Sequence, residues 1–212
     1  MKEEDILNDM ISRYPALEDC KYDILEACKA VINCYSNHGK LLLCGNGGSC
    51  SDAEHIVGEL MKSFERKRPI DKTLEGSLKS VSGERGAFIA DRLQNALPAI
   101  SLNAHSALYS AISNDMDANL VFAQQIAGYG QKNDVLIAIS TSGNSQNIVD
   151  AAITAKAKGL TVIGLTGENG GRMKQYCDIA ICVPSLSTPE VQEYHQPIYH
   201  TICRIAENRF FQ

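Results

Sequence analysis

Four side chains able to transfer a proton or bind a metal ion occur as two pairs along this sequence. The first pair is His55 and Glu59, in the stretch DAEHIVGEL at residues 52–60. A separation of four residues places both on one face of a helix, where an imidazole and a carboxylate can bind a divalent metal or transfer a proton. A surface ion pair has the same spacing and is the commoner arrangement, so this pair alone does not decide a function.

The second pair is Gln192 and His200, in the stretch VQEYHQPIYH at residues 191–200. Eight residues are a little over two helical turns, so both side chains lie on a similar face. His195 lies three residues from Gln192 and satisfies helical spacing as well. Pro197 lies between the two members of the pair and is expected to kink the helix, because an interior proline costs about 3 kcal/mol.

Two glycine-rich segments each follow an apolar run: GNGGS at residues 45–49 and STSGNS at residues 140–145. Glycine permits the positive φ of a tight turn from strand to helix. The free N–H groups at a helix N-terminus then suit a phosphate or carboxylate, and the hydroxyl groups add donors. Ordinary turn and capping chemistry explains either segment alone about equally well. Neither segment has the GKS/GKT of a phosphate-binding P-loop or the GxGxxG pattern, so together they favour a sugar phosphate over a nucleotide.

Five apolar runs are expected to be the strands that position these segments. Such near-continuous apolar runs, alternating with helical patterns, indicate a parallel sheet covered on both faces, the α/β class. Ligands of such sheets bind at the carboxyl ends of the strands, where both glycine-rich segments would lie. The runs are Lys40–Cys44, Pro98–Leu102, Asp134–Ser140, Leu160–Thr166 and Ile179–Pro184.

Helical spacing of apolar residues marks the segments between and around these runs. Residues 4–37 show this spacing, with Pro15 as a break, and Asn147–Gly159 ends in the lysine and glycine typical of a helix C-terminus. The last helix is expected over Ser187–Phe211, because Ser187 and Thr188 precede Pro189 and Glu190.

Residues 70–97 do not fit this alternation. The segment has no strand pattern, and connections this long in a compact α/β domain usually carry a function or are disordered. Its end, GAFIADRLQNAL, spaces apolar residues by about a helical turn. We expect Phe88–Leu97 to form a short helix packed on a neighbouring subunit or over the mouth of the active site, with Lys72–Glu84 as the mobile part. A solvated surface loop is the alternative.

The composition limits the class of protein. The sequence has 212 residues and a formal net charge of −5, which suits one α/β domain over 1–212 with an N-terminal helical segment (1–38) and an insertion (70–97). The absence of a long basic run weighs against nucleic acid or an anionic membrane as partner. Eight cysteines without a CxxC pair favour a reduced, cytoplasmic chain over a disulfide-bonded one.

Several segments together resemble the sugar isomerase (SIS) domain family over nearly the whole chain except 70–97: CGNGGS, DAEHIVGEL, ISND (112–115), ISTSGNS, LTGENGG and VQEYHQPIYH. The resemblance implies a three-layer fold with a five-stranded parallel sheet between helices, assembled as a homotetramer with active sites at subunit interfaces. It implies a phosphosugar aldose–ketose isomerase of heptose biosynthesis, which converts sedoheptulose 7-phosphate to D-glycero-D-manno-heptose 7-phosphate through an enediol(ate).

The resemblance also implies roles for particular residues. Zinc, one ion per subunit, would be bound by His55, Glu59, Gln192 and His200. Glu59 would be the catalytic base and His200 the acid that serves the oxygens. A carboxylate that binds zinc is a weaker base, so these two roles of Glu59 oppose each other. The matching substrate-binding positions are Asn46, Gly47, Gly48, Ser49, Glu59, Asn114, Asp115, Ser140, Thr141, Ser142, Ser145 and Gln192.

The sequence departs from the family pattern in two places. The insertion at 70–97 is absent from the typical member, and Glu190 stands where an arginine usually precedes the motif containing Gln192. Both changes could alter the substrate, so an isomerase of another phosphosugar is one alternative. A non-catalytic SIS-fold factor that binds another protein is a second, but such a factor would not need the His/Glu/Gln/His set.

Overall fold

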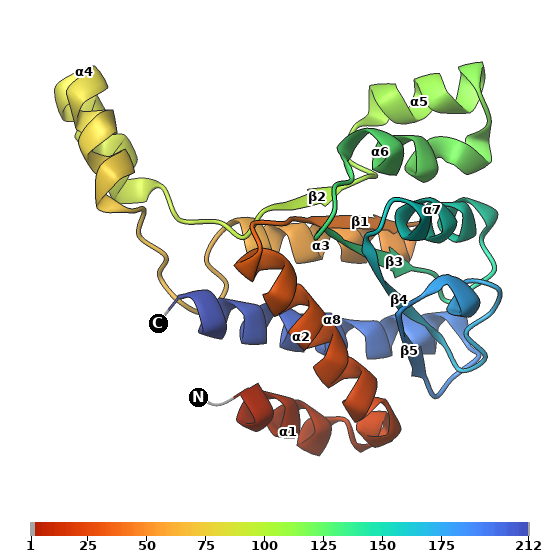
Figure 1. The fold of residues 1–212 in the computed structure, drawn as a ribbon. Coiled ribbons are helices and arrows are strands. Elements are labelled where there is room, and N and C mark those ends of the chain that lie inside the picture. Colours follow the sequence, from red (N-terminus) through yellow and green to blue (C-terminus); the bar gives the residue numbers. More distant parts are fainter. Residues whose placement is uncertain (1–2, 212) are drawn as a thin grey trace.

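One five-stranded parallel sheet organises the chain, with helices on both faces (Figure 1). The structure, a computed structural model, describes residues 3–211; Met1, Lys2 and Gln212 lie outside the described residues. The strand order is β2-β1-β3-β4-β5. Each strand falls within or beside an apolar run predicted as a strand, so the α/β class is confirmed. The strands are β1 (Leu41–Gly45), β2 (Ala99–Ser101), β3 (Val135–Ile139), β4 (Thr161–Gly167) and β5 (Ile179–Val183).

The helices of both chain ends share one face of the sheet with α3. The predicted break at Pro15 is confirmed, because the short 3-10 helix η1 (Pro15–Cys20) separates the first two helices. The last helix runs through Pro197 without ending there. Apolar side chains of this layer form one continuous core with the sheet. The layer consists of α1 (Glu3–Arg13), α2 (Lys21–Ser36), α3 (Gly48–Met61) and α8 (Thr188–Phe210).

Three helices cover the opposite face and enclose a second core (Figure 1). They are α5 (Ser106–Asp115), α6 (Val121–Tyr129) and α7 (Gln146–Ala157), with the short 3-10 helices η2 (Ala118–Leu120) and η3 (Lys174–Tyr176). Strand β1 illustrates how one apolar run serves both cores. Leu41 and Leu43 contribute to the first core and Leu42 and Cys44 to the second, because successive side chains point to opposite faces of a sheet.

The segment predicted as an insertion forms a helical arm that stands away from the sheet (Figure 1). This arm, α4 (Lys72–Arg92), reverses direction at Ser82 and Gly83, which have non-helical dihedral angles. A Cβ on Gly86 would overlap the carbonyl oxygen of Leu78. In a continuous helix those two residues would be about 12 Å apart, so α4 is a hairpin of two short helices.

One expectation for this segment is wrong, because the helix predicted over Phe88–Leu97 ends at Arg92. Lys72–Glu84, expected to be the mobile part, is mostly helical, and no residue of α4 lines the cavity described below within the same chain. Its mobility and its packing on a neighbouring subunit stay predictions. The apolar spacing of residues 88–97 predicted a helix that continues to Leu97. In the structure the chain turns back at Gly83 and its backbone becomes extended at Leu93. Large apolar side chains of the arm, and of Leu93 directly after it, remain exposed; those of the arm are Leu74, Val81 and Phe88.

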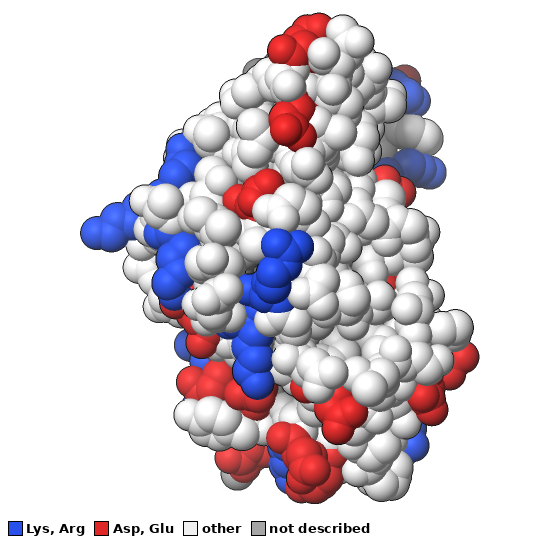
Figure 2. Space-filling model, turned by 90° about the vertical axis from the view of Figure 1, so that its right-hand side faces the viewer, with Lys and Arg blue, Asp and Glu red and all other residues white. Residues whose placement is uncertain are grey.

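The surface charges are mixed on the face drawn in Figure 2. Small groups of basic and acidic side chains are interspersed among uncharged surface there, without one continuous basic area. Within residues 3–211, no helix is long and apolar enough to cross a membrane.

Candidate functional site

The two glycine-rich turns lie side by side at the carboxyl ends of β1 and β3. These strands are neighbours, and the strand order reverses direction between them, which is where open α/β sheets bind ligands. The side-chain amides of Asn46 and Asn147 join the turns through two reciprocal hydrogen bonds of 2.9 and 3.0 Å. Between the turns is a cavity of about 300 Å³, lined by Asn46, Gly47, Gly48, Ser49, Ile139, Ser140, Thr141, Ser145, Thr188 and Gln192.

Glycine is required at both turns for steric reasons. Gly47 has a φ of +56° and Gly143 a φ of +63°, a region that side chains with a Cβ rarely adopt. A Cβ on Gly143 would also overlap the carbonyl oxygen of Gly170. The chain can therefore enter α3 and α7 at these angles only with glycine at these positions.

The helices that follow the turns present unpaired donors to the cavity. Neither Gly47, before α3, nor Ser145, before α7, caps its helix with a side chain. The N–H groups of Ser49 and Cys50 in α3 and of Ile148 in α7 donate to carbonyl oxygens of the preceding turns. This leaves the very first N–H group of each helix, at Gly48 and at Gln146, for a ligand, and the positive end of each helix dipole favours an anion. Ser140 and Ser145 add hydroxyl groups 3.4 Å apart. This set of donors suits a phosphate group.

The proton-transfer candidates form a second cluster, further along α3 and α8. His55 Nε2 lies 3.1 Å from Glu59 Oε1, and the His55 and His200 ring centroids are 5.1 Å apart. Lys62 Nζ lies 3.5 Å from the other Glu59 oxygen. The spacing argument for His55 and Glu59 is thus confirmed, and His200 joins them from the facing helix.

His200 is held in its neutral form by its surroundings. Burial lowers its pKa, and the nearby His55 lowers it further, with Glu59 opposing them. Its Nε2 atom is buried without a hydrogen-bond partner among the described residues. A neutral, unpaired ring nitrogen at this position is available to a substrate oxygen or a metal ion.

Comparison with known proteins identifies the family. The SIS domain profile matches residues 8–89 and 85–167. The chain belongs to the SIS domain family.

Other SIS proteins are similar to this chain over nearly its whole length. A phosphoheptose isomerase of a Nitratiruptor species is 38% identical over 208 residues, 98% of this chain and 97% of that protein. One of Clostridium acetobutylicum is 37% identical over 99% of this chain and 94% of that protein. Among solved structures, a phosphoheptose isomerase from Francisella tularensis has a TM-score of 0.75 and 31% identity, covering 98% and 100% of the two chains.

The SIS domain brings most of the predicted substrate positions together, but not all of them. Ser142 and Glu59 do not line the cavity, and the Ser142 hydroxyl accepts a hydrogen bond from the Asn144 N–H at 3.2 Å. Asn114 and Asp115 lie at the exposed end of α5, hydrogen-bonded to each other at 2.8 Å. These two residues reach neither cluster within one chain.

The predicted zinc ligands do not converge on one point. Within residues 3–211, no three His, Cys, Asp or Glu side chains are placed to hold a metal ion. Gln192 lines the cavity between the turns and contacts Gly48 instead. The types of His55, Glu59 and His200 nevertheless fit zinc, since two histidines and one glutamate occur in catalytic zinc sites.

Sequence reasoning missed residues that complete both clusters. Asn147 and Thr188 border the cavity. Tyr199 hydrogen-bonds to His55 at 3.0 Å, and Asp52 lies near both side chains. The signals were present, because Tyr199 directly precedes His200 and Asp52 lies one helical turn before His55. The alternative His195 is fully buried in the core, so it does not compete with His200.

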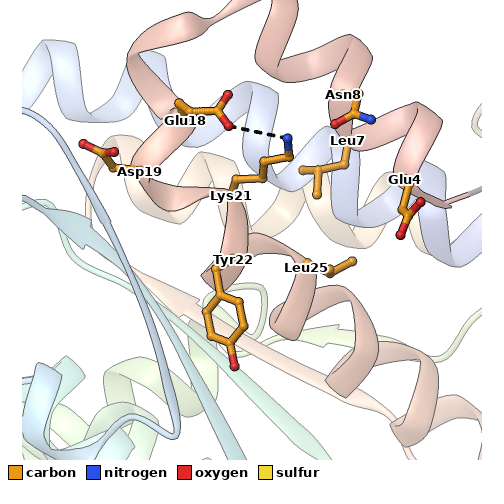
Figure 3. Close-up of a pocket in the computed structure, with 8 residues that line it drawn as sticks. All are labelled: Glu4, Leu7, Asn8, Glu18, Asp19, Lys21, Tyr22 and Leu25. Carbon is orange, nitrogen blue, oxygen red and sulfur yellow. Dashed lines mark hydrogen bonds and ion pairs between the residues drawn. The ribbon is translucent and has the colours of Figure 1, made fainter.

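A larger pocket of about 490 Å³ lies elsewhere, between α1, η1 and α2 (Figure 3). Its rim carries the carboxylates of Glu4, Glu18 and Asp19, and only Lys21, bonded to Glu18, is basic. Like charge would repel a phosphate there. The smaller cavity between the glycine turns has no acidic side chain in its lining.

Proposed function

We propose that this chain is an aldose–ketose isomerase that converts sedoheptulose 7-phosphate to D-glycero-D-manno-heptose 7-phosphate. The observation that carries the proposal is the joined pair of glycine turns, whose donors face one cavity. Glu59 and His200 supply acid–base groups on the two helices that continue from this region. The similarity to phosphoheptose isomerases over nearly the full chain supports the same reaction.

The phosphate of the substrate binds between the turns. The first residue of α3, Gly48, and the hydroxyls of Ser49, Ser140, Thr141 and Ser145 border this cavity, and the N-terminus of α7 follows directly after Ser145. Such donors position an anion without needing a lysine or arginine. Asn46 holds the two turns at a fixed separation, which sets the position of the phosphate.

The reaction moves one proton from C1 to C2 of the sugar. Glu59 removes a proton from C1, and the electron pair of that C–H bond forms the C1–C2 double bond. The C2 carbonyl oxygen receives a proton from His200, giving an enediol. His200 then takes the proton of the C1 hydroxyl, and Glu59 returns its proton to C2, which yields the aldose. Each positioned acid or base typically contributes about 10²–10⁴-fold to the rate.

Zinc is the proposed cofactor, and His55, Glu59 and His200 would hold it, whereas Gln192 lies in the other cavity. When bound, zinc supplies a Lewis acid that stabilises negative charge on a carbonyl oxygen. Support comes from the donor types and from the unpartnered Nε2 of His200. Metal analysis should find about one zinc per subunit, and chelation should reduce activity; full activity after exhaustive chelation would remove zinc from the proposal.

We propose that the active site is completed in a homotetramer. Glu59 lies eleven residues after Gly48 on α3, about 16 Å along the helix axis. An extended seven-carbon phosphate is only about 10 Å from C1 to phosphorus, given C–C bonds of about 1.5 Å. The turns of one chain and the acid–base pair of a second copy would therefore serve one substrate.

Mixed tetramers test this arrangement. Thr141→Val together with Ser145→Ala removes hydroxyls from the phosphate cavity, and Glu59→Gln removes the base. Each variant should be inactive alone. If one chain supplies the turns of a site and a second chain its acid–base pair, refolding the two variants together should restore part of the activity, because some sites then combine intact turns with an intact Glu59. No restoration in tetramers proven by native mass spectrometry to be mixed would place each site within one chain.

The acid–base roles have their own test. Glu59→Gln and His200→Asn should each lower kcat by about 10²–10⁴-fold while the circular dichroism spectrum is kept. A near-normal rate in either variant would remove that residue from the mechanism.

We place the protein in the cytoplasm, because all eight cysteines are unpaired, as a reducing compartment predicts.

The position of Glu190 supports a second candidate substrate, a phosphosugar other than sedoheptulose 7-phosphate. Glu190 lies between the cavity residues Thr188 and Gln192, and its carboxylate accepts a 2.6 Å hydrogen bond from Ser185. Glu190 thus places a negative charge beside the cavity, where the family usually has an arginine. This reverses the sign of the charge next to the bound sugar. Assay of a panel of ketose phosphates distinguishes these substrates, and turnover of none of them would favour a non-catalytic SIS factor.

A further inference from the structure

The two glycine turns differ in how firmly the rest of the chain holds them. The second turn, at residues 140–145, packs closely against residues 170–173, since a Cβ on Gly143 would overlap the carbonyl oxygen of Gly170. The N–H of Met173 donates to the Gly143 carbonyl oxygen at 2.9 Å, and the Met173 side chain is fully buried in the second core. The second turn is therefore fixed to the body of the protein.

Arg172 adds a side-chain anchor to the same turn. Its two terminal nitrogens donate to the carbonyl oxygen of Asn144 at 2.7 Å and to Gln146 Oε1 at 2.9 Å. Its backbone N–H donates to Asn144 Oδ1 at 3.1 Å. A planar guanidinium loses little conformational freedom for each such hydrogen bond. Arg172 thus holds the end of the second turn together with the first residue of α7.

The tip of the first turn, Asn46 and Gly47, has no comparable support. Both residues are exposed, and a Cβ on Gly47 would meet no atom within 4 Å. Side chains from elsewhere in the fold contact Gly45 before the tip and Gly48 after it. Within residues 3–211, the side chain of Asn46 hydrogen-bonds only to Asn147. The tip therefore depends on this one partner for a fixed position.

Asn147, in the first turn of α7, connects the tip to the anchored second turn. Its amide exchanges two hydrogen bonds with the Asn46 amide, at 2.9 and 3.0 Å. Two bonds between planar amides fix the relative orientation of the groups as well as their separation. Asn46 lines the phosphate cavity, whereas Asn147 is not among the residues that line it. Any effect of Asn147 on a bound phosphate therefore passes through Asn46.

We propose that Asn147 is a positioning residue that holds Asn46, and with it the first glycine turn, in the geometry that binds the phosphate. The inference rests on the proposed phosphate cavity and extends it to a residue outside the lining. A preordered site binds its ligand more tightly, because the apparent dissociation constant rises as the fraction of molecules in the binding geometry falls.

Inorganic phosphate is the probe, titrated into the metal-free protein by isothermal titration calorimetry. Asn147→Ala should weaken phosphate binding by about 5–30-fold, because two hydrogen bonds that order the first turn are lost. Asn33→Ala is the matched control, because it removes another exposed amide–amide hydrogen bond, from Asn37 at 3.1 Å, on α2. This control should bind phosphate as the wild type does, and both variants should keep the wild-type melting temperature.

A double-mutant cycle separates positioning from direct contact. If Asn147 acts only through Asn46, adding Asn147→Ala to Asn46→Ala should weaken phosphate binding by less than about 2-fold further. An equal effect of Asn147→Ala in both backgrounds would show that Asn147 contacts the phosphate itself, and would overturn the positioning role.

The remaining outcomes separate this inference from the proposed reaction. With sedoheptulose 7-phosphate, Asn147→Ala should raise KM by the factor found for phosphate with little change in kcat, as expected when only ground-state binding is lost. Wild-type phosphate affinity in Asn147→Ala, or no phosphate binding by the wild type, would overturn the inference. If phosphate binding follows the cycle but no sedoheptulose 7-phosphate is converted, Asn147 keeps its role and the isomerase proposal fails.

Discussion

Replacing Glu207 by leucine should strongly destabilise the protein, because it leaves a buried arginine without its counter-ion. Arg68 and Glu207 are 0% and 1% exposed, and their charged groups are 2.8 Å apart. Arg68 also donates to the carbonyl oxygens of Leu60 and Glu59, at 2.7 and 3.1 Å. The pair therefore fastens the end of α3, which carries Glu59, to α8.

The expected loss follows from this burial. Burial alone would raise the pKa of Glu207, but N–H donors from Phe64 and Glu65, together with Arg68, lower it on balance. The carboxylate is thus charged and fully satisfied in the folded protein. Removing one partner of such a pair costs about 3–5 kcal/mol. For a chain of this size that corresponds to a fall in melting temperature of roughly 6–20 °C.

Urea and thermal unfolding, followed by circular dichroism, measure this effect in the metal-free protein. Arg68→Met combined with Glu207→Leu should lose less than the Glu207→Leu variant alone, because no charge then remains buried. Glu26→Gln breaks the exposed pair with Lys29 and should leave the melting temperature unchanged. A loss below about 1 kcal/mol in Glu207→Leu, the value of a surface pair, would refute the reasoning.

Three further predictions concern other parts of the chain. Burial lowers the pKa of His195 to about 4, so the unfolded chain binds a proton below pH ~6.5 while the folded one does not. The free energy of unfolding should therefore fall by up to about 3 kcal/mol from pH 6.5 to 4 in urea titrations, and His195→Leu should flatten that slope. A Cβ on Gly45 would overlap the carbonyl oxygen of Ser49; Gly45→Ala should cost about 1–3 kcal/mol and raise KM, and wild-type kinetics would contradict this. Replacing Lys72–Ala96 by a short Gly/Ser linker should change the oligomer size in light scattering or the substrate preference, and no change in either would make α4 dispensable.

Local patterns in the sequence were sufficient to predict the sheet and the two glycine turns that border the cavity. An apolar run followed by a glycine turn is a short-range signal, and it identified both β1 with Gly47 and β3 with Gly143. Helical spacing was equally reliable for His55 and Glu59, because both lie within one uninterrupted helix.

Contacts between distant segments could not be predicted in this way. Arg68 and Glu207 are 139 residues apart in the sequence, and nothing in the residues around either one indicates that the two form a pair. The Tyr199 hydroxyl reaches His55 across 144 residues. The sequence pattern did not predict the reversal at Gly83 either, because a glycine inside a helical pattern does not show whether the helix continues or the chain turns back.

Conversion of sedoheptulose 7-phosphate in D₂O, followed by ¹H and ³¹P NMR, tests the central proposal most directly. Proton transfer through Glu59 and an enediol predicts an aldose 7-phosphate that carries deuterium at C2, because the carboxyl proton exchanges with solvent. The Glu59→Gln variant should form this product about 10²–10⁴-fold more slowly. No aldose phosphate from the purified, zinc-supplemented protein would contradict the proposed function, and product formed by Glu59→Gln at the wild-type rate would contradict the proposed proton transfer.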